Sequence, residues 1–310
     1  MRATGFFVAA VLSVCVAGCH RKPPEPPAPP PPLAPAAFSG ARALEEVRRL
    51  VEFSPRDAGT PGAEKAARHL EARLRELGVE SAIDEFTDRS PKGDTVFRNV
   101  IGTLPGQGEG TVILASHYDT RSGVGKGFEG ANDSGSSSGA LLELARSLAA
   151  SPPRAHETVF VFFDGEECMK HYGPADGLHG SRRLAAQAVR DRWAKDVKAF
   201  LLLDMVGDRD LTVTVPRNGT PALISAVFAA AAEEGVRPKF SLYPMEIGDD
   251  HEPFLAAGIP AVDLIDFQYG SRPGRNDYWH TPEDRMDKLS AESLETVGRV
   301  VIRVLNGLGE

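Results

Sequence analysis

The sequence predicts an α/β fold, a three-layer α/β/α sandwich around a central mixed, mostly parallel sheet. From about residue 38 to the end of the 310-residue chain, amphipathic helical patterns alternate with short apolar runs that are typical of buried strands. Neither an internal repeat nor a second linker interrupts this alternation. Segments that alternate in this way place helices on both faces of one sheet.

The first half of the domain begins with two predicted helices, residues 41–53 and 62–77, in which apolar residues recur at i, i+3 and i+4. Thr60-Pro61-Gly62 precedes the second one as a helix-start signal. Two apolar runs follow at 99–104 and 111–115. A Pro-Gly-Gln-Gly turn joins the two runs, which predicts that they are neighbouring strands.

The second half continues the alternation. Apolar runs predict strands, and helical spacing predicts helices up to a long amphipathic helix at the C-terminus. The predicted strands are 159–163, 199–203, 211–215 and 261–265, and the predicted helices are 136–150, 181–193, 221–234 and 290–308.

The N-terminus predicts export. Arg2 precedes an apolar stretch at 6–16 that is too short to span a bilayer, and Val16-Ala17-Gly18-Cys19 resembles a bacterial lipobox. We therefore expect a lipoprotein signal peptide at 1–19 with lipidated Cys19, a Pro-rich linker at 20–37, and a folded domain at 38–310. His20 after that Cys resembles the outer-membrane sorting pattern, which predicts a lipid-anchored protein of the bacterial cell envelope. The alternative is a plain signal peptide with an incidental Cys.

Charge and cysteine content exclude other classes of function. A net charge of −8 and a pI near 5.6 argue against a nucleic-acid partner. Cys168 is the remaining cysteine of the predicted domain, so an internal disulfide is excluded there. Cys168 has no His-Asn or His-Asp pairing specific to it, so we expect a small buried residue rather than a catalytic thiol.

Short segments rich in acids and histidines follow or flank the predicted central strands or lie in Gly-rich loops. Side chains placed beyond the ends of central strands converge on one rim of the sheet, where α/β enzymes keep their sites. Asp, Glu and His together suit zinc. The segments are His117-Tyr118-Asp119, Gly130-Ala131-Asn132-Asp133-Ser134, Phe163-Asp164-Gly165-Glu166-Glu167, Leu203-Asp204 and Trp279-His280-Thr281.

The residues suggest individual roles with alternatives. Asp119 follows His117 closely enough to orient its imidazole as a metal ligand. Asp133 sits in a Gly-rich turn that opens a helix, so it is either a ligand or a turn residue. The adjacent acids Glu166 and Glu167 are costly at a sheet end unless a cation or proton compensates them. Adjacent residues point in different directions, so one can bind metal while the other acts as general acid or base.

In this order the motifs resemble the zinc aminopeptidase superfamily, metallopeptidase family 28, and within it the animal-type glutaminyl-peptide cyclotransferases. The resemblance covers essentially the whole domain. Two segments carry the likeness to the cyclases: an insertion at 169–176 after the Glu pair, and Asp249-Asp250-His251-Glu252-Pro253-Phe254-Leu255. The implied activity is conversion of an N-terminal glutamine to pyroglutamate with release of ammonia, on peptide or protein N-termini.

The resemblance implies a role for each matching residue. It implies one zinc ion per chain held by Asp133, Glu167 and His280, Glu166 as general acid/base, Asp204 and Asp249 hydrogen-bonded with it, and Trp279 as an aromatic wall. The chain departs from the animal enzymes at the substrate pocket. Tyr172 stands where they have Trp, Gly248 where they have Gln and Arg275 where they have Phe, and their disulfide is missing.

The main alternative is a zinc aminopeptidase with a second metal at His117 and Asp204, bridged by Asp133. All residues for that second site are present, so the ligand set leaves both functions open. In a cyclase, the side chains of His117, Asp119 and Asp204 would instead form hydrogen bonds around the site of the single zinc ion. A third alternative is a metal-free binding lipoprotein of the same fold, against which the presence of every candidate ligand argues.

Overall fold

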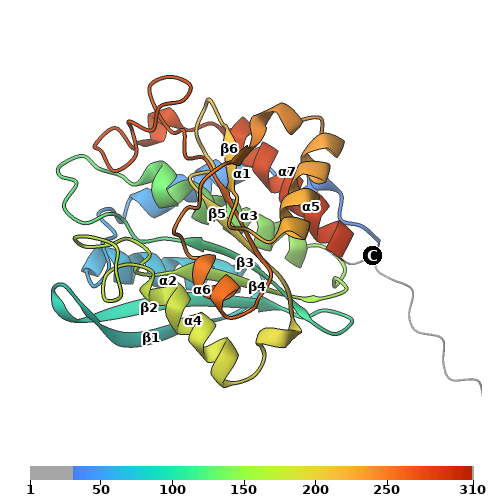
Figure 1. The fold of residues 1–310 in the computed structure, drawn as a ribbon, viewed down its shortest axis with the longest axis horizontal. Coiled ribbons are helices and arrows are strands. Elements are labelled where there is room, and N and C mark those ends of the chain that lie inside the picture. Colours follow the sequence, from blue (N-terminus) through green and yellow to red (C-terminus); the bar gives the residue numbers. More distant parts are fainter. Residues whose placement is uncertain (1–30, 309–310) are drawn as a thin grey trace, which may run out of the picture.

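The computed structural model describes residues 31–308, and a mixed six-stranded sheet forms its centre (Figure 1). The strands lie in the order β1 (Glu80–Ser90), β2 (Gly93–Leu104), β4 (Glu157–Phe163), β3 (Thr111–His117), β5 (Val197–Asp204) and β8 (Ala261–Ile265). The last four of these are parallel to one another, and β1 and β2 add an antiparallel ribbon at one edge. The predicted mixed, mostly parallel sheet is confirmed.

Helices cover both faces of this sheet and complete the three predicted layers. Residues of β3 alternate between two cores: Val112 and Leu114 belong to the larger core, and Ile113 and Ala115 to the smaller one. Alternation of this kind is expected when each face of a strand packs against its own helix layer. The larger core includes α1 (Gly40–Val51), α2 (Pro61–Glu76), α3 (Ser137–Ala149), α5 (Pro221–Glu233) and α7 (Ala291–Leu308), and the smaller one α4 (His179–Arg190) and α6 (Glu252–Ala256).

The first two helices begin where the sequence predicts them. The Ser39 hydroxyl accepts a hydrogen bond from the Arg42 N–H at the start of α1, and the Thr60 hydroxyl accepts one from the Ala63 N–H at the start of α2. These side chains satisfy backbone donors that have no partner inside the helix. Pro61 occupies the first turn of α2, where its missing N–H costs nothing.

Two features of the predicted strand arrangement are wrong. β2 and β3 are not neighbours, because β4 lies between them: Val100 pairs with Phe162 on one side, and Ala115 pairs with Val161 on the other. The short turn after β2 therefore connects it to β3, which lies two positions away in the sheet, on the far side of β4. Of the predicted strand 211–215, residues 213–215 belong to β6 (Val213–Pro216), which pairs with β7 (Phe240–Tyr243) in a separate two-stranded sheet.

Part of the predicted linker contacts the domain. The Leu33 N–H donates to the Asn306 side chain at 3.0 Å, the Asn306 amide donates back to the Leu33 carbonyl at 2.9 Å, and the Leu33 side chain joins the larger core. The predicted signal peptide, Cys19 and residues 20–30 lie outside the described residues. Within 31–308, none of the helices is long and apolar enough to cross a membrane. Cys168 is buried and forms no disulfide with any described residue.

Candidate active site

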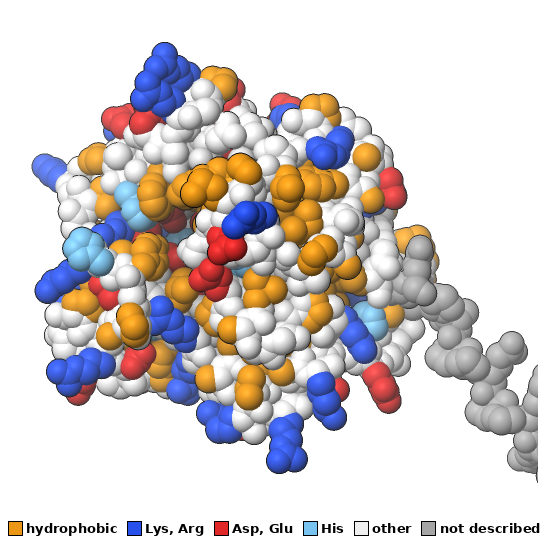
Figure 2. All heavy atoms as spheres, in the orientation of Figure 1, with side chains coloured by type: hydrophobic (Ala, Val, Ile, Leu, Met, Phe, Trp, Pro, Cys, Tyr) orange, Lys and Arg blue, Asp and Glu red, His pale blue; other side chains and the backbone are white. Residues whose placement is uncertain are grey.

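A pocket of about 320 Å³ opens beyond the carboxyl ends of the central strands. His117 is the last residue of β3, Asp204 is the last residue of β5, and Glu166 and Glu167 follow β4 closely. Parallel strands end at one rim of the sheet, which is why residues distant in sequence meet here. Figure 2 shows apolar side chains gathered around a hollow in which acidic side chains are recessed.

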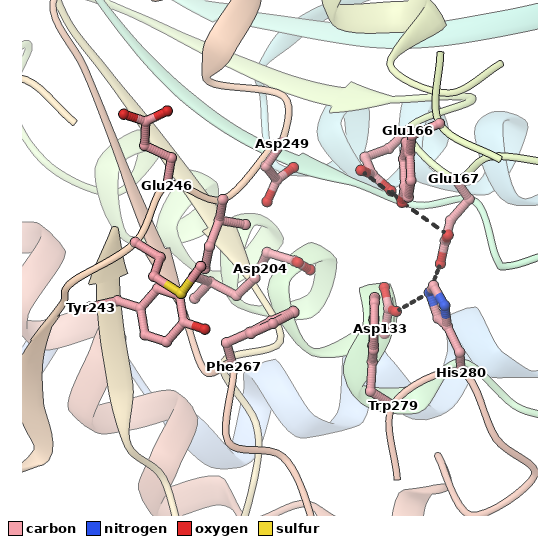
Figure 3. A pocket seen from close by; sticks show the side chains of 15 residues that line it. Asp133, Glu166, Glu167, Asp204, Tyr243, Glu246, Asp249, Phe267, Trp279 and His280 are labelled. Atoms are coloured by element: carbon pink, nitrogen blue, oxygen red, sulfur yellow. Dashed lines mark hydrogen bonds and ion pairs between the residues drawn. The ribbon is translucent and has the colours of Figure 1, made fainter. Parts of the chain in front are cut away.

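Asp133, Glu167 and His280 form one cluster of potential metal ligands (Figure 3). His280 Nε2 lies 2.9 Å from Glu167 Oε1 and 3.2 Å from Asp133 Oδ2. Both carboxylates are buried, and the imidazole is partly buried. Asp133 lies in η2 (Ala131–Ser136), the short helical segment directly before α3, Glu167 lies in the loop after β4, and His280 lies in the loop between β8 and η5 (Met286–Lys288).

Asp133 also belongs to a second cluster with His117 and Asp204. His117 Nε2 lies 3.1 Å from Asp133 Oδ1 and 3.2 Å from Asp204 Oδ1. One carboxylate oxygen of Asp133 therefore faces each histidine, as a bridging ligand would require. The residues of the predicted second metal site are thus assembled as well, and the geometry alone leaves the number of metal ions open.

The donor set of the first cluster fits zinc. Two carboxylates and one imidazole, with room for a substrate atom, correspond to an open tetrahedral site. Burial raises the pKa of Glu167 to about 8, and the negative charge of Asp133 adds to the rise while His280 opposes it. A bound cation would relieve this repulsion between buried carboxylates.

Glu166 lies beside the cluster but makes a different contact. The Tyr172 hydroxyl lies 3.3 and 3.2 Å from the two Glu166 carboxylate oxygens and 3.3 Å from Glu167 Oε2. Burial raises the pKa of Glu166 well above its usual value; nearby His117 opposes the rise, and Asp249 and Glu167 add to it. A carboxyl group in this environment holds a proton more readily than one in water, as a proton shuttle requires.

Most of the remaining predicted residues line the same pocket. Asp249 is buried and contributes to the wall together with Gly248. Among the described residues, Glu166 has no hydrogen bond to Asp204 or Asp249, and Asp204 contacts His117 instead. Trp279 stacks on the His280 ring with centroids 4.0 Å apart. The pocket wall also includes Tyr172, whereas the exposed Arg275 is not part of it.

Asp119 has a role that the sequence does not reveal. Its carboxylate accepts hydrogen bonds from the backbone N–H groups of Glu166 and Glu167, both at 3.2 Å. The predicted contact with His117 is longer, with 3.5 Å between Asp119 Oδ1 and His117 Nδ1. Asp119 therefore holds the chain that carries the Glu pair at least as directly as it orients the imidazole.

Two residues that no sequence pattern singles out support the segment that carries Asp133. The fully buried Arg56 guanidinium donates to the backbone carbonyls of Tyr118, Glu129 and Gly130 at 2.8 to 2.9 Å. Asp284 accepts hydrogen bonds from the Asn132 N–H at 2.7 Å and the Asp133 N–H at 3.2 Å. A local motif could not reveal either residue, because their partners are backbone atoms. Every residue has such atoms, so the sequence of the partner segment does not indicate the contact.

The fold and site together define an α/β/α sandwich that carries a carboxylate–histidine cluster beyond its parallel strands. The sequence profile of peptidase family M28 matches residues 99–305, and the chain therefore belongs to peptidase family M28. This confirms the family predicted from the motifs.

Comparisons with individual proteins show a likeness to glutaminyl cyclases. The chain is 35% identical to the crystal structure of a glutaminyl cyclase from an Acidobacteriales bacterium, with a TM-score of 0.84 over 92% of this chain and 98% of that one. It is 29% identical to the glutaminyl-peptide cyclotransferase of Boiga irregularis over 81% of this chain and 76% of that protein.

The chain is also similar to a solved structure of an exopeptidase. A Zn-dependent exopeptidase from Parabacteroides distasonis is 27% identical, with a TM-score of 0.74 over 86% of this chain and 98% of that one. The overall fold is therefore common to both classes, and the pocket must distinguish them.

Proposed function

We propose that this protein is a zinc-dependent glutaminyl-peptide cyclotransferase, an acyltransferase that converts N-terminal glutamine to pyroglutamate and releases ammonia. The observation that carries the proposal is the placement of Glu166. This buried carboxylate lies beside the ligand cluster, in a pocket walled by Tyr172, Gly248 and Asp249. Tyr172 and Asp249 belong to the two segments that carry the likeness to the cyclases, and Gly248 directly precedes the second of them.

Cyclisation of glutamine is an intramolecular aminolysis. The substrate's α-nitrogen bonds to its own side-chain carbonyl carbon, the bond from that carbon to the amide nitrogen breaks, and ammonia leaves. Glu166 takes a proton from the attacking amine and returns it to the leaving nitrogen. The chemistry that zinc supplies at such a site is Lewis-acid polarisation of a carbonyl. The pocket holds amine and carbonyl close together, which lowers the entropic part of the barrier.

We expect one zinc ion per chain, held by Asp133, Glu167 and His280, and activity that depends on it. Ammonia release from a glutamine-initiated peptide should disappear after treatment with a chelator and return with zinc. Elemental analysis of protein purified without chelators measures the metal content. Ammonia release that continues in metal-free protein would contradict zinc dependence.

The second candidate is a zinc aminopeptidase, favoured by the assembled cluster of His117, Asp133 and Asp204. An enzyme of that kind must activate water, for which two metal ions on either side of a bridging carboxylate are suited. The cyclase reaction needs no such water, because the substrate supplies its own nucleophile. Two zinc ions per chain, together with hydrolysis of amino-acid amides, would decide for the aminopeptidase.

We further propose that the enzyme is a lipid-anchored protein of the bacterial cell envelope. The support is Val16-Ala17-Gly18-Cys19 followed by the Pro-rich stretch. In a Gram-negative host the wild-type chain should partition with membranes and begin at a lipidated Cys19. Cys19→Ala should release the domain or leave it unprocessed. A soluble, unlipidated wild-type protein, found by fractionation and mass spectrometry of its N-terminus, would refute the anchor.

A further inference from the structure

Tyr172 makes a contact that a wall residue does not need. Its hydroxyl lies 3.3 and 3.2 Å from the two oxygens of Glu166 and 3.3 Å from Glu167 Oε2. These distances are long for O–H···O hydrogen bonds, and the single hydroxyl proton faces three acceptor oxygens. The hydroxyl thus lies between the proposed proton shuttle and a proposed zinc ligand.

The segment that carries Tyr172 is held by its own contacts. The Asp176 carboxylate accepts hydrogen bonds from the backbone N–H groups of Met169, Lys170 and His171. The Arg182 guanidinium donates to the backbone carbonyls of Gly173 and Pro174 at 2.9 and 3.0 Å. Residues on both sides of Tyr172 are therefore fixed, although 47% of the Tyr172 surface is exposed.

The backbone of Gly177 lies close to the Tyr172 ring. Its φ is +90°, a conformation that favours glycine, and a Cβ atom there would lie 2.6 Å from the Tyr172 ring. The absence of a side chain at this position allows the ring to approach the backbone closely. The inserted segment is thus built to hold one aromatic ring against the Glu pair.

We propose that Tyr172 is a positioning residue for the proton shuttle, whose hydroxyl holds the Glu166 carboxylate toward the substrate amine. This deepens the proposed function and rests on it. The hydroxyl keeps its own proton throughout the reaction, and Glu166 alone transfers protons. A carboxylate free to rotate would spend part of its time turned away from the amine, so the contact acts on the rate of the chemical step.

The test compares Tyr172→Phe with Tyr172→Leu on a glutamine-initiated peptide. Phe keeps the aromatic wall and removes only the hydroxyl, so kcat should fall about tenfold while KM and zinc content stay at their wild-type values. Leu removes the wall as well, so a comparable fall in kcat should be joined by a several-fold rise in KM. A merely structural role for the ring would raise KM without this separate effect on kcat.

A double-mutant cycle tests whether the loop acts through this hydroxyl. Asp176→Asn weakens the contacts that hold the loop, so it should lower kcat in the same direction as Tyr172→Phe. The kcat of the double variant should be little lower than that of Tyr172→Phe alone, because Asp176→Asn cannot displace a hydroxyl that has already been removed. Fully additive losses would mean that the loop acts by another route and would contradict the loop's part in the proposal.

Wild-type kcat in Tyr172→Phe, or loss of zinc that accounts for its lower rate, would overturn the proposal. Failure of the proposed function is a separate result, recognised when the wild-type enzyme leaves the glutamine-initiated peptide uncyclised. If that enzyme hydrolyses amino-acid amides instead, the same Phe variant is measured on that reaction. An unchanged kcat there would likewise overturn the positioning role.

Discussion

Glu166→Gln should lower turnover of a glutamine-initiated peptide by roughly 100-fold or more while zinc remains bound. The substitution keeps the shape of the side chain and removes the group that accepts a proton. Glu166 is suited to that task because it is buried beside the ligand cluster and contacts Tyr172 rather than a histidine. Steady-state kinetics and elemental analysis of the same preparation measure the two quantities together.

Glu167→Gln is the matched control, because the two residues are adjacent and differ in their contacts. Glu167 Oε1 lies 2.9 Å from His280 Nε2, within the ligand cluster. This variant should therefore lose zinc affinity, and added zinc should restore part of its activity. If Glu166→Gln loses zinc and Glu167→Gln retains it, the two roles are assigned the wrong way round.

Arg56→Ala should reduce the free energy of unfolding by on the order of 3 kcal/mol. The substitution removes the donors of the Tyr118, Glu129 and Gly130 carbonyls and leaves space in the interior. Burial lowers the pKa of Arg56 to about 10, with nearby carboxylates led by Asp284 opposing the change, so the side chain is charged at neutral pH. Its loss also removes a fixed positive charge near the acidic pocket.

The control for this variant is Arg190→Ala, the same substitution at the protein surface. The Arg190 side chain is 64% exposed, and its ion pair with Asp191 lies in water. Its removal should change the free energy of unfolding by no more than about 0.5 kcal/mol. Denaturant unfolding of both variants is measured in the presence of a chelator, so that metal binding does not contribute to the free energy of unfolding. A loss below about 1 kcal/mol in Arg56→Ala would refute a supporting role for Arg56.

The sequence predicts much of the sheet because buried strands are locally recognisable. The apolar run at 159–163 lies inside β4, and the run at 199–203 lies inside β5. β1 has no such apolar run, since its Glu80–Ser90 sequence is rich in charged residues and mostly exposed at the sheet edge. Strand order has no local signal either, because nothing in the turn after β2 indicates that β4 would occupy the neighbouring position.

The sequence locates the clustered acids and histidines but misses Arg56, and the reason is the position of each residue. Candidate site residues such as Asp204 stand directly at strand ends, so a local sequence pattern is enough to locate them. Arg56 and Asp119 act on backbone groups of distant segments, and only the folded chain shows those pairings. Tyr172 is an intermediate case: its position in the pocket could be predicted, whereas its hydroxyl contact with Glu166 could not.

We expect this protein to cyclise an N-terminal glutamine and not to cleave the peptide bond that follows it. A synthetic peptide with N-terminal glutamine, incubated with the zinc-loaded protein, tests this by mass spectrometry of the product. We expect a product of unchanged chain length that has lost one molecule of ammonia, and no change in a matched peptide that begins with leucine. A product shorter by its first residue would contradict the claim and identify an aminopeptidase.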